Sequence, residues 1–152
     1  MPESEYGTNY RADYLRMYQD YVASADKISE RRHGANTYFL AINTTLLGVT
    51  GYLQGDPERL LWLAALAGVV FSYTWRRLIA SYKSLNSAKF DVIQVMEQQL
   101  PLAPYYAEWK QLQRDKHVSF SAVESWVPLA FMVMHGIVCV VNLYSWFSSL
   151  GS

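Results

Sequence analysis

Hydrophobic and polar positions divide this chain into stretches with and without charge. Lys, Arg, Asp and Glu are absent from 33–55, 60–75 and 125–152, and nearly all of them lie in 1–32 and 76–124. A helix on the surface of a soluble protein keeps a polar face, whereas a bilayer core takes about 20 apolar residues of helix to cross. We therefore expect three membrane-spanning helices, over about 36–53, 60–79 and 126–147. The alternative is a soluble bundle with buried helices, which rarely lose all charge over such lengths.

The charged stretches also carry helical periodicity. Apolar residues recur every three or four positions over 7–32, and a heptad-like seam continues from Leu78 to Met96. The helix that continues from the predicted second span is expected to end near Gln99, because Pro101 and Pro104 follow it. A short helix is expected over 105–114. The predicted fold is all-α, a three-span membrane protein with a cytoplasmic helical layer that assembles as a homo-oligomeric ring. Its predicted parts are 1–33 (cytoplasmic helix), 34–80 (two spans), 81–124 (cytoplasmic helix and turn) and 125–152 (third span).

Basic residues predict the orientation in the membrane. They flank the predicted first and second spans on one side, and the connection over 54–59 carries a single arginine. The positive-inside rule then places the N-terminus in the cytoplasm and the C-terminus outside a bacterial inner membrane. At the cytoplasmic mouth, a basic ring is expected to bind anionic headgroups or to discourage small cations. Its members are Arg31, Arg32, Arg76 and Arg77.

The first predicted span has a polar face. Two adjacent rows repeat every seven residues, which is nearly two helical turns: Asn36, Asn43 and Thr50, and beside them Thr37, Thr44 and Gly51. The apolar residues of this span, among them Phe39, are assigned to the other face. An amide in lipid would lack a hydrogen-bond partner, so the polar face must meet protein or water. It is either a contact between helices or the lining of an uncharged passage, and both interpretations predict an oligomer.

Candidate catalytic chemistry is sparse. The only soft ligands at helical spacing are His135 and the single cysteine, Cys139, and a third and fourth ligand are not evident. His33 sits at the expected membrane entrance and His117 in a charged loop. No phosphate-binding glycine loop and no nucleophile elbow occurs. We expect no enzyme activity, no metal and no cofactor, and the net charge of zero gives no reason to expect nucleic-acid binding.

Several short stretches, taken in their order and spacing, resemble the RipA family of small bacterial membrane proteins. They are 27–32, 36–40, 43–48, 75–82, 85–90 (with Asn86, Lys89 and Phe90), and the turn with Pro101, Pro104, Tyr105 and Trp109. The resemblance covers about Tyr18 to Val127. It implies a homo-octamer in the inner membrane and implies no activity. A looser likeness, in architecture alone, is to small helical membrane effectors of anti-phage systems.

Together these observations lead to one functional hypothesis and one alternative. The hypothesis is a regulated pore that permeabilises or depolarises the inner membrane in bacterial defence or stress response. The alternative is a non-conducting membrane scaffold that supports a partner protein or the integrity of the envelope. The expected partners are other copies of the chain, membrane lipids and a cytoplasmic defence or signalling protein.

Overall fold

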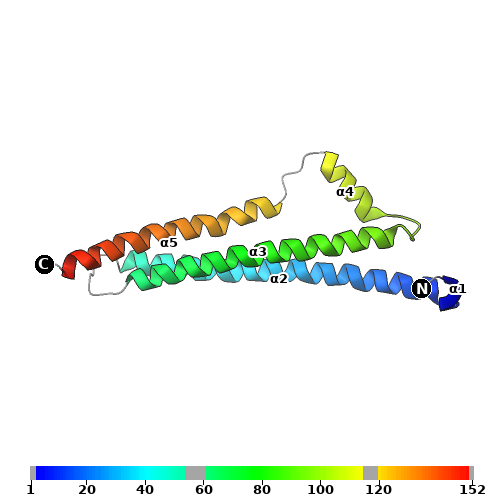
Figure 1. Ribbon diagram of the computed structural model, residues 1–152, viewed down its shortest axis with the longest axis horizontal. Helices are drawn as coiled ribbons and strands as arrows, with labels where there is room; N and C mark the ends of the chain where they lie inside the picture. Colours follow the sequence, from blue (N-terminus) through cyan, green and yellow to red (C-terminus); the bar gives the residue numbers. More distant parts are fainter. Residues whose placement is uncertain (1–2, 54–60, 115–119, 151–152) are drawn as a thin grey trace. The chain divides into compact units, whose positions relative to one another are not determined.

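Every element in the described part of the chain is a helix. The computed structural model describes residues 3–53, 61–114 and 120–150. The helices are α1 (Glu3–Tyr6), α2 (Tyr10–Tyr52), α3 (Leu61–Glu97), α4 (Pro104–Arg114) and α5 (Phe120–Leu150), labelled in Figure 1. The prediction of an all-α fold is confirmed for this part of the chain.

Three helices, α2, α3 and α5, are far longer than the average helix of a globular protein. α2 joins the amphipathic stretch over 10–32 to the polar stretch that follows, because no proline interrupts the sequence between them. α3 likewise continues without a break and ends at Glu97, a few residues before Pro101. α4 begins at Pro104, a position where the missing proline N–H costs no helical hydrogen bond.

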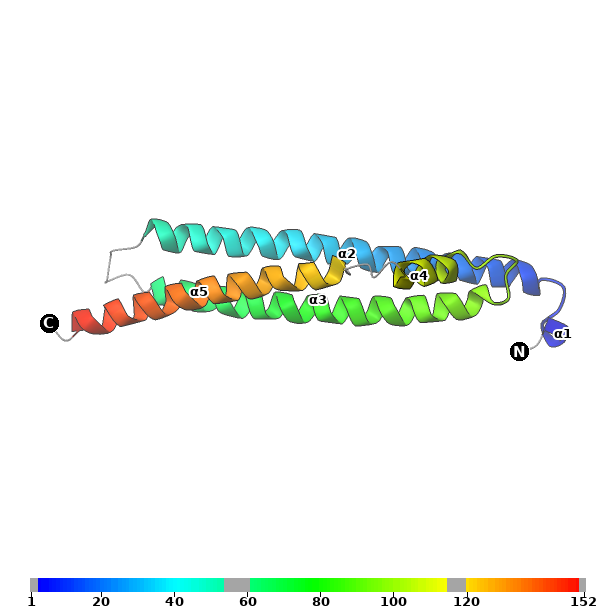
Figure 2. The ribbon, with the colours of Figure 1, turned by 90° about the horizontal axis from the view of Figure 1, so that it is seen from above.

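The chain forms two compact units, which we describe separately. Unit 1 comprises Met1–Arg31 and Tyr82–Val118, and unit 2 comprises Arg32–Ser81 and Ser119–Ser152. In each unit, parts of α2 and α3 lie side by side (Figure 2). The assignment of 1–33 and 81–124 to the cytoplasm stays a prediction.

Unit 2 has a small aromatic core. Phe39, Trp75 and Ile79 are buried together, and the rings of Phe39 and Trp75 stack with centroids 6.1 Å apart. Phe131 of α5 packs against the same cluster. Phe39 therefore lies on the face of α2 that meets the other helices, and its assignment to the opposite face was wrong. Residues four apart on a helix share a face, which places Phe39 beside Asn43.

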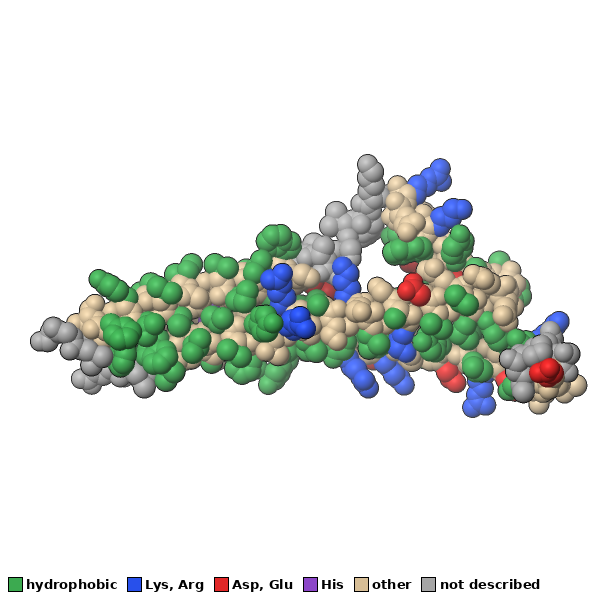
Figure 3. Space-filling model, viewed as in Figure 1, with side chains coloured by type: hydrophobic (Ala, Val, Ile, Leu, Met, Phe, Trp, Pro, Cys, Tyr) green, Lys and Arg blue, Asp and Glu red, His purple; other side chains and the backbone are tan. Residues whose placement is uncertain are grey.

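The prediction of three membrane spans is wrong. Among the described residues, one stretch is long and apolar enough to cross a membrane, Glu124–Ser148 in α5, and 11% of its most apolar window is buried. The predicted first span falls in α2, where recurring Asn, Thr and Gly lower the apolar character, and the predicted second span in α3 contains Arg76 and Arg77. Residues 54–60 lie outside the described part. In Figure 3 the C-terminal part of α5 shows hydrophobic side chains and no charged ones on the visible face.

Candidate functional site

Unit 2 contains a buried polar cluster within apolar surroundings. Its members are Asn43 of α2, Ser72 of α3 and His135 of α5, all with no exposed surface. The Ser72 hydroxyl donates to Asn43 Oδ1 at 2.7 Å, while Asn43 Nδ2 donates to the Phe39 carbonyl at 2.8 Å. The asparagine amide therefore has a partner at both ends, and the cluster joins α2 to α3 without a charge.

His135 occupies its place because Gly68 leaves room for it. A Cβ atom on Gly68 would lie 2.3 Å from two atoms of the imidazole ring, which is a steric clash. Neither ring nitrogen of His135 has a hydrogen-bond partner among the described residues. The imidazole ring thus fills the space that Gly68 leaves between α3 and α5.

The two polar rows of α2 are placed differently. In the first row, Asn43 and Thr50 are fully buried and Asn36 is half-buried, accepting a hydrogen bond from Trp75 Nε1 at 2.9 Å. Thr50 donates to the Leu46 carbonyl of its own helix at 2.8 Å. This row lies against α3 and α5 of the same chain.

The second row is exposed in the protomer. Further small residues lie on the same face, at steps of three and four positions. Together with the second row they form what we call the small stripe: Gly34, Thr37, Ala41, Thr44, Gly48 and Gly51. Nothing lies within 4 Å of a Cβ added at any of its three glycines. The small stripe is thus an uncharged, uncovered surface.

The four arginines of the predicted basic ring differ in exposure and in their contacts. Arg32 forms a salt bridge with Glu124 at 3.4 Å, between the middle of α2 and the start of the apolar stretch of α5. Arg31, Arg76 and Arg77 are exposed. Because both partners keep about a quarter of their side-chain surface exposed, the Arg32–Glu124 pair is worth at most about 1 kcal/mol.

Unit 1 has its own polar centre, the carboxylate of Glu97 at the end of α3. Glu97 is 1% exposed, and its oxygens accept hydrogen bonds from the backbone N–H groups of Tyr105 and Tyr106 at 3.0 and 2.9 Å. The Tyr18 hydroxyl donates to the same carboxylate at 3.0 Å. A negative charge that receives free N–H groups at a helix N-terminus is favourable, so Glu97 caps α4 and connects it to α2 and α3.

A row of tyrosines on α2 extends this centre. Tyr14 donates to the Met96 carbonyl at 2.7 Å, and Tyr10 donates to Gln99 Oε1 at 3.1 Å. Burial, followed by the hydrogen bond to Glu97, raises the pKa of Tyr18 from 10.0 to about 12. Burial also raises the pKa of Tyr14. These phenols therefore stay protonated and keep donating over the physiological pH range.

Of the positions of the family-like motif, Tyr105 lies at this centre, and the others differ in their surroundings. Phe90 packs against Tyr105 with ring centroids 5.7 Å apart, and Lys89 donates to Ser24 while its ammonium lies 4.5 Å from the centre of the Tyr21 ring. Pro104 starts α4, Pro101 is exposed in the preceding turn, and Asn86 is half-buried. Trp109 is 50% exposed and does not contribute to the Glu97 centre.

Three residues of these sites were missed in the sequence, namely Glu97, Ser72 and Gly68. The four-residue spacing of Tyr10, Tyr14 and Tyr18 was visible, but it was interpreted as an apolar stripe, with the hydroxyl groups ignored. The capping box places its Glu within the first turn of the helix that it caps, so that motif gives no signal for Glu97, which precedes α4. Nothing in the sequence pairs Gly68 with His135.

The chain belongs to the Octameric membrane protein family (8xMP), whose family model matches residues 15–144. The protein is thus a self-associating membrane protein, and the likeness to RipA proteins is supported at the level of this family. No curated protein and no solved structure matches the chain significantly. The described residues contain no group of three or more His, Cys, Asp or Glu placed to hold a metal ion.

Proposed function

We propose that the protein forms a homo-octameric, regulated pore in the bacterial inner membrane, which permeabilises or depolarises that membrane in defence or stress response. The observation that carries the proposal is the small stripe of α2, which is uncharged, contains two threonines and is uncovered in the protomer. Around the axis of a ring such a surface would be wettable without binding ions tightly. The proposal includes no catalytic step. A specific relationship of this chain to RipA proteins is part of the proposal.

In this proposal α5 anchors each copy in the bilayer through Glu124–Ser148. The basic residues before it support an orientation with unit 1 in the cytoplasm and the C-terminus outside. Exposed apolar side chains elsewhere in unit 2, such as Leu66 and Phe71, are covered in the assembled particle. The Glu97 centre holds α4 and is the part of the protein where a cytoplasmic signal or partner would act.

A non-conducting scaffold is the second candidate, and one observation favours it. Small residues at steps of three and four allow helices to approach closely, as in many contacts between membrane helices. If the small stripe packs against a neighbouring copy over its full length, it cannot line a passage.

Purified octamer in liposomes distinguishes the two functions. Thr44→Leu places a larger, apolar side chain on the wall of a lumen, which makes the lumen narrower and less readily wetted. We therefore expect ion flux to fall while the particle mass stays unchanged. Thr74→Leu is the matched control, because Thr74 is an exposed threonine of α3 outside the small stripe. Absence of flux from wild-type octamer under every condition would contradict the pore. Loss of the octamer in Thr44→Leu would instead assign the stripe to subunit contact.

A further inference from the structure

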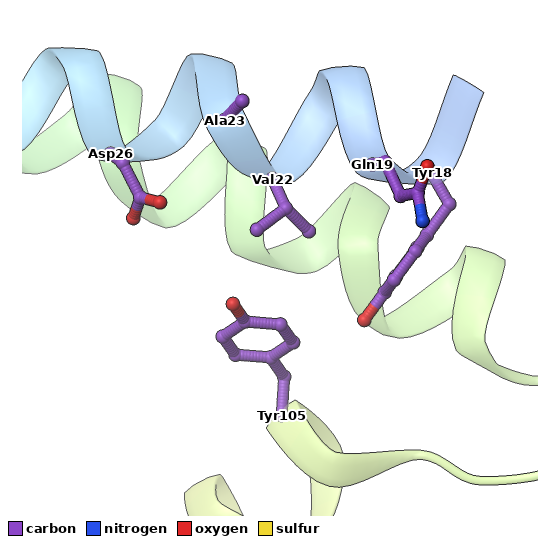
Figure 4. Close-up of a pocket in the computed structure, with 6 residues that line it drawn as sticks. All are labelled: Tyr18, Gln19, Val22, Ala23, Asp26 and Tyr105. Carbon is purple, nitrogen blue, oxygen red and sulfur yellow. The ribbon is translucent and has the colours of Figure 1, made fainter. Parts of the chain in front are cut away.

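Unit 1 contains a cavity of about 230 Å³ at the joint between α2 and the first turn of α4. In Figure 4 the side chains of Tyr18 and Asp26 extend from α2 on either side of Val22, and the Tyr105 ring of α4 points toward them. Gln19 and Ala23 complete the lining. The cavity thus offers two aromatic rings, one carboxylate and an apolar wall.

The electrostatic environment of the cavity is negative. Asp26 is exposed, and its carboxylate has no ion-pair partner among the described residues. The pKa of Tyr105 is raised, first by burial and then by the negative charges of Asp26, Glu108 and Glu97. Three carboxylates therefore act on the phenol that points into the cavity, and the lining itself supplies no cation.

This combination selects one class of ligand. An anion would be repelled, and a neutral apolar molecule would take water away from Asp26 without replacing it. A metal ion needs several oxygen ligands, and the lining supplies a single carboxylate. An organic cation satisfies each part of the cavity, because its charge pairs with Asp26 and lies against phenol rings while its carbon atoms contact Val22.

We propose that this cavity binds an organic cation of the alkylammonium or guanidinium class. The group belongs either to a free amine or to a Lys or Arg side chain of a neighbouring copy. The proposal does not depend on whether the octamer conducts. Because Tyr18 of α2 and Tyr105 of α4 line the same cavity, a bound cation contacts both helices and stabilises the docking of α4 on α2. Binding at this site is thereby coupled to the position of α4.

Titration of the full-length purified oligomer with n-butylammonium chloride tests the proposal, with n-butanol as the neutral probe of similar shape. Saturation-transfer NMR should detect n-butylammonium and not n-butanol. Asp26→Asn should weaken binding about tenfold, and Tyr105→Leu about fivefold through the lost ring face. Asp20→Asn, an exposed carboxylate of α2 outside the cavity, is the matched control and should leave the affinity unchanged.

Light scattering on the same samples distinguishes the two sources of the cation. If n-butylammonium binds and the particle mass is constant, the natural occupant is a free amine. If n-butylammonium or Asp26→Asn lowers the particle mass, the occupant is a basic side chain of a neighbouring copy. Equal affinity of wild type and Asp26→Asn, or the absence of both binding and any change in mass, overturns the proposal.

Discussion

Units 1 and 2 each contain part of α2 and part of α3. The contacts that stabilise unit 1 internally differ in kind from those that stabilise unit 2. In unit 1, long side chains reach across to polar groups, as when Tyr18 and two amides of α4 converge on Glu97. In unit 2, short side chains allow the helices to approach closely, as when Gly68 admits the ring of His135. Unit 1 therefore connects its helices through long polar side chains, whereas unit 2 combines short hydrogen bonds, such as that of Ser72 to Asn43, with close packing of helices. The same helix can serve both purposes because its exposed and buried faces change in residue type along its length.

The largest effect is expected from adding volume to unit 2. Gly68→Ala places a Cβ within 2.3 Å of the His135 ring and should lower the free energy of unfolding by about 2–3 kcal/mol. Gly136→Ala is the control, since nothing lies within 4 Å of its added Cβ and alanine favours helix. Unfolding midpoints of the detergent-solubilised protein measure both.

The pair can be tested further by a double substitution. In a background of His135→Ala, the clash at Gly68 disappears, so Gly68→Ala should cost much less than in wild type. If the two substitutions add independently, the close approach of Gly68 and His135 does not determine the packing of unit 2.

Removing hydrogen-bond chemistry from unit 1 should have the next largest effect. Glu97→Ala leaves the Tyr18 hydroxyl and two amides of α4 without their acceptor and should cost about 2 kcal/mol. The amides of Tyr105 and Tyr106 should then exchange faster with deuterium, because α4 loses its cap. Glu108→Ala, on the exposed side of α4, should change neither quantity noticeably. Unchanged exchange in Glu97→Ala would show that α4 is held by other contacts.

A smaller effect should separate the two polar rows of α2. Asn43→Ala removes the acceptor of the buried Ser72 hydroxyl and should destabilise unit 2 by about 1–2 kcal/mol. Thr44→Ala changes an exposed side chain and should alter the stability of the protomer by less than about 0.5 kcal/mol. Chemical denaturation measures both variants, and a cycle of Asn43→Ala, Ser72→Ala and the double variant gives the coupling free energy between Asn43 and Ser72. Equal losses in Asn43→Ala and Thr44→Ala would contradict the different placement of the two rows.

The smallest effect concerns pH and is confined to unit 1. The pKa of Tyr18 is about 12 in the folded protein against 10.0 ordinarily, so folding favours the protonated phenol. Its contribution to stability is complete below pH 10 and is lost as the pH rises toward 12. Tyr18→Phe should therefore lose less stability between these values than wild type does. Tyr106→Phe, with an exposed ring, is the control, and parallel curves for wild type and Tyr18→Phe would refute the prediction.

Much of the local structure could be predicted from the sequence. The helix over 105–114 and the end of α3 before Pro101 follow from periodicity and from the geometry of proline, which are local properties. The number of membrane spans could not be predicted in the same way. Absence of charge was taken as apolar character. Asn, Thr and Gly in α2 are uncharged, yet they make the transfer of this helix into lipid less favourable.

The candidate sites were predicted less well, for a related reason. Periodicity grouped Asn36, Asn43 and Thr50 as one row, yet it could not say that this row meets other helices of the same chain. The tyrosines of α2 were counted among the apolar residues that recur over 7–32, without their acceptors, since Glu97 lies 79 residues from Tyr18 in sequence. Hydrogen bonds at such separations depend on which helices become neighbours.

The sequence by itself determined that this protein is helical, where its helices end, and that its charges avoid one set of segments. These properties depend on interactions within a few residues, where the chain's own geometry leaves little choice. Only the tertiary structure decided that Glu97 caps α4, that Gly68 makes room for His135, and that one polar row of α2 is buried while the small stripe is exposed. Each of these depends on the approach of distant helices, which is set by the packing of all side chains together.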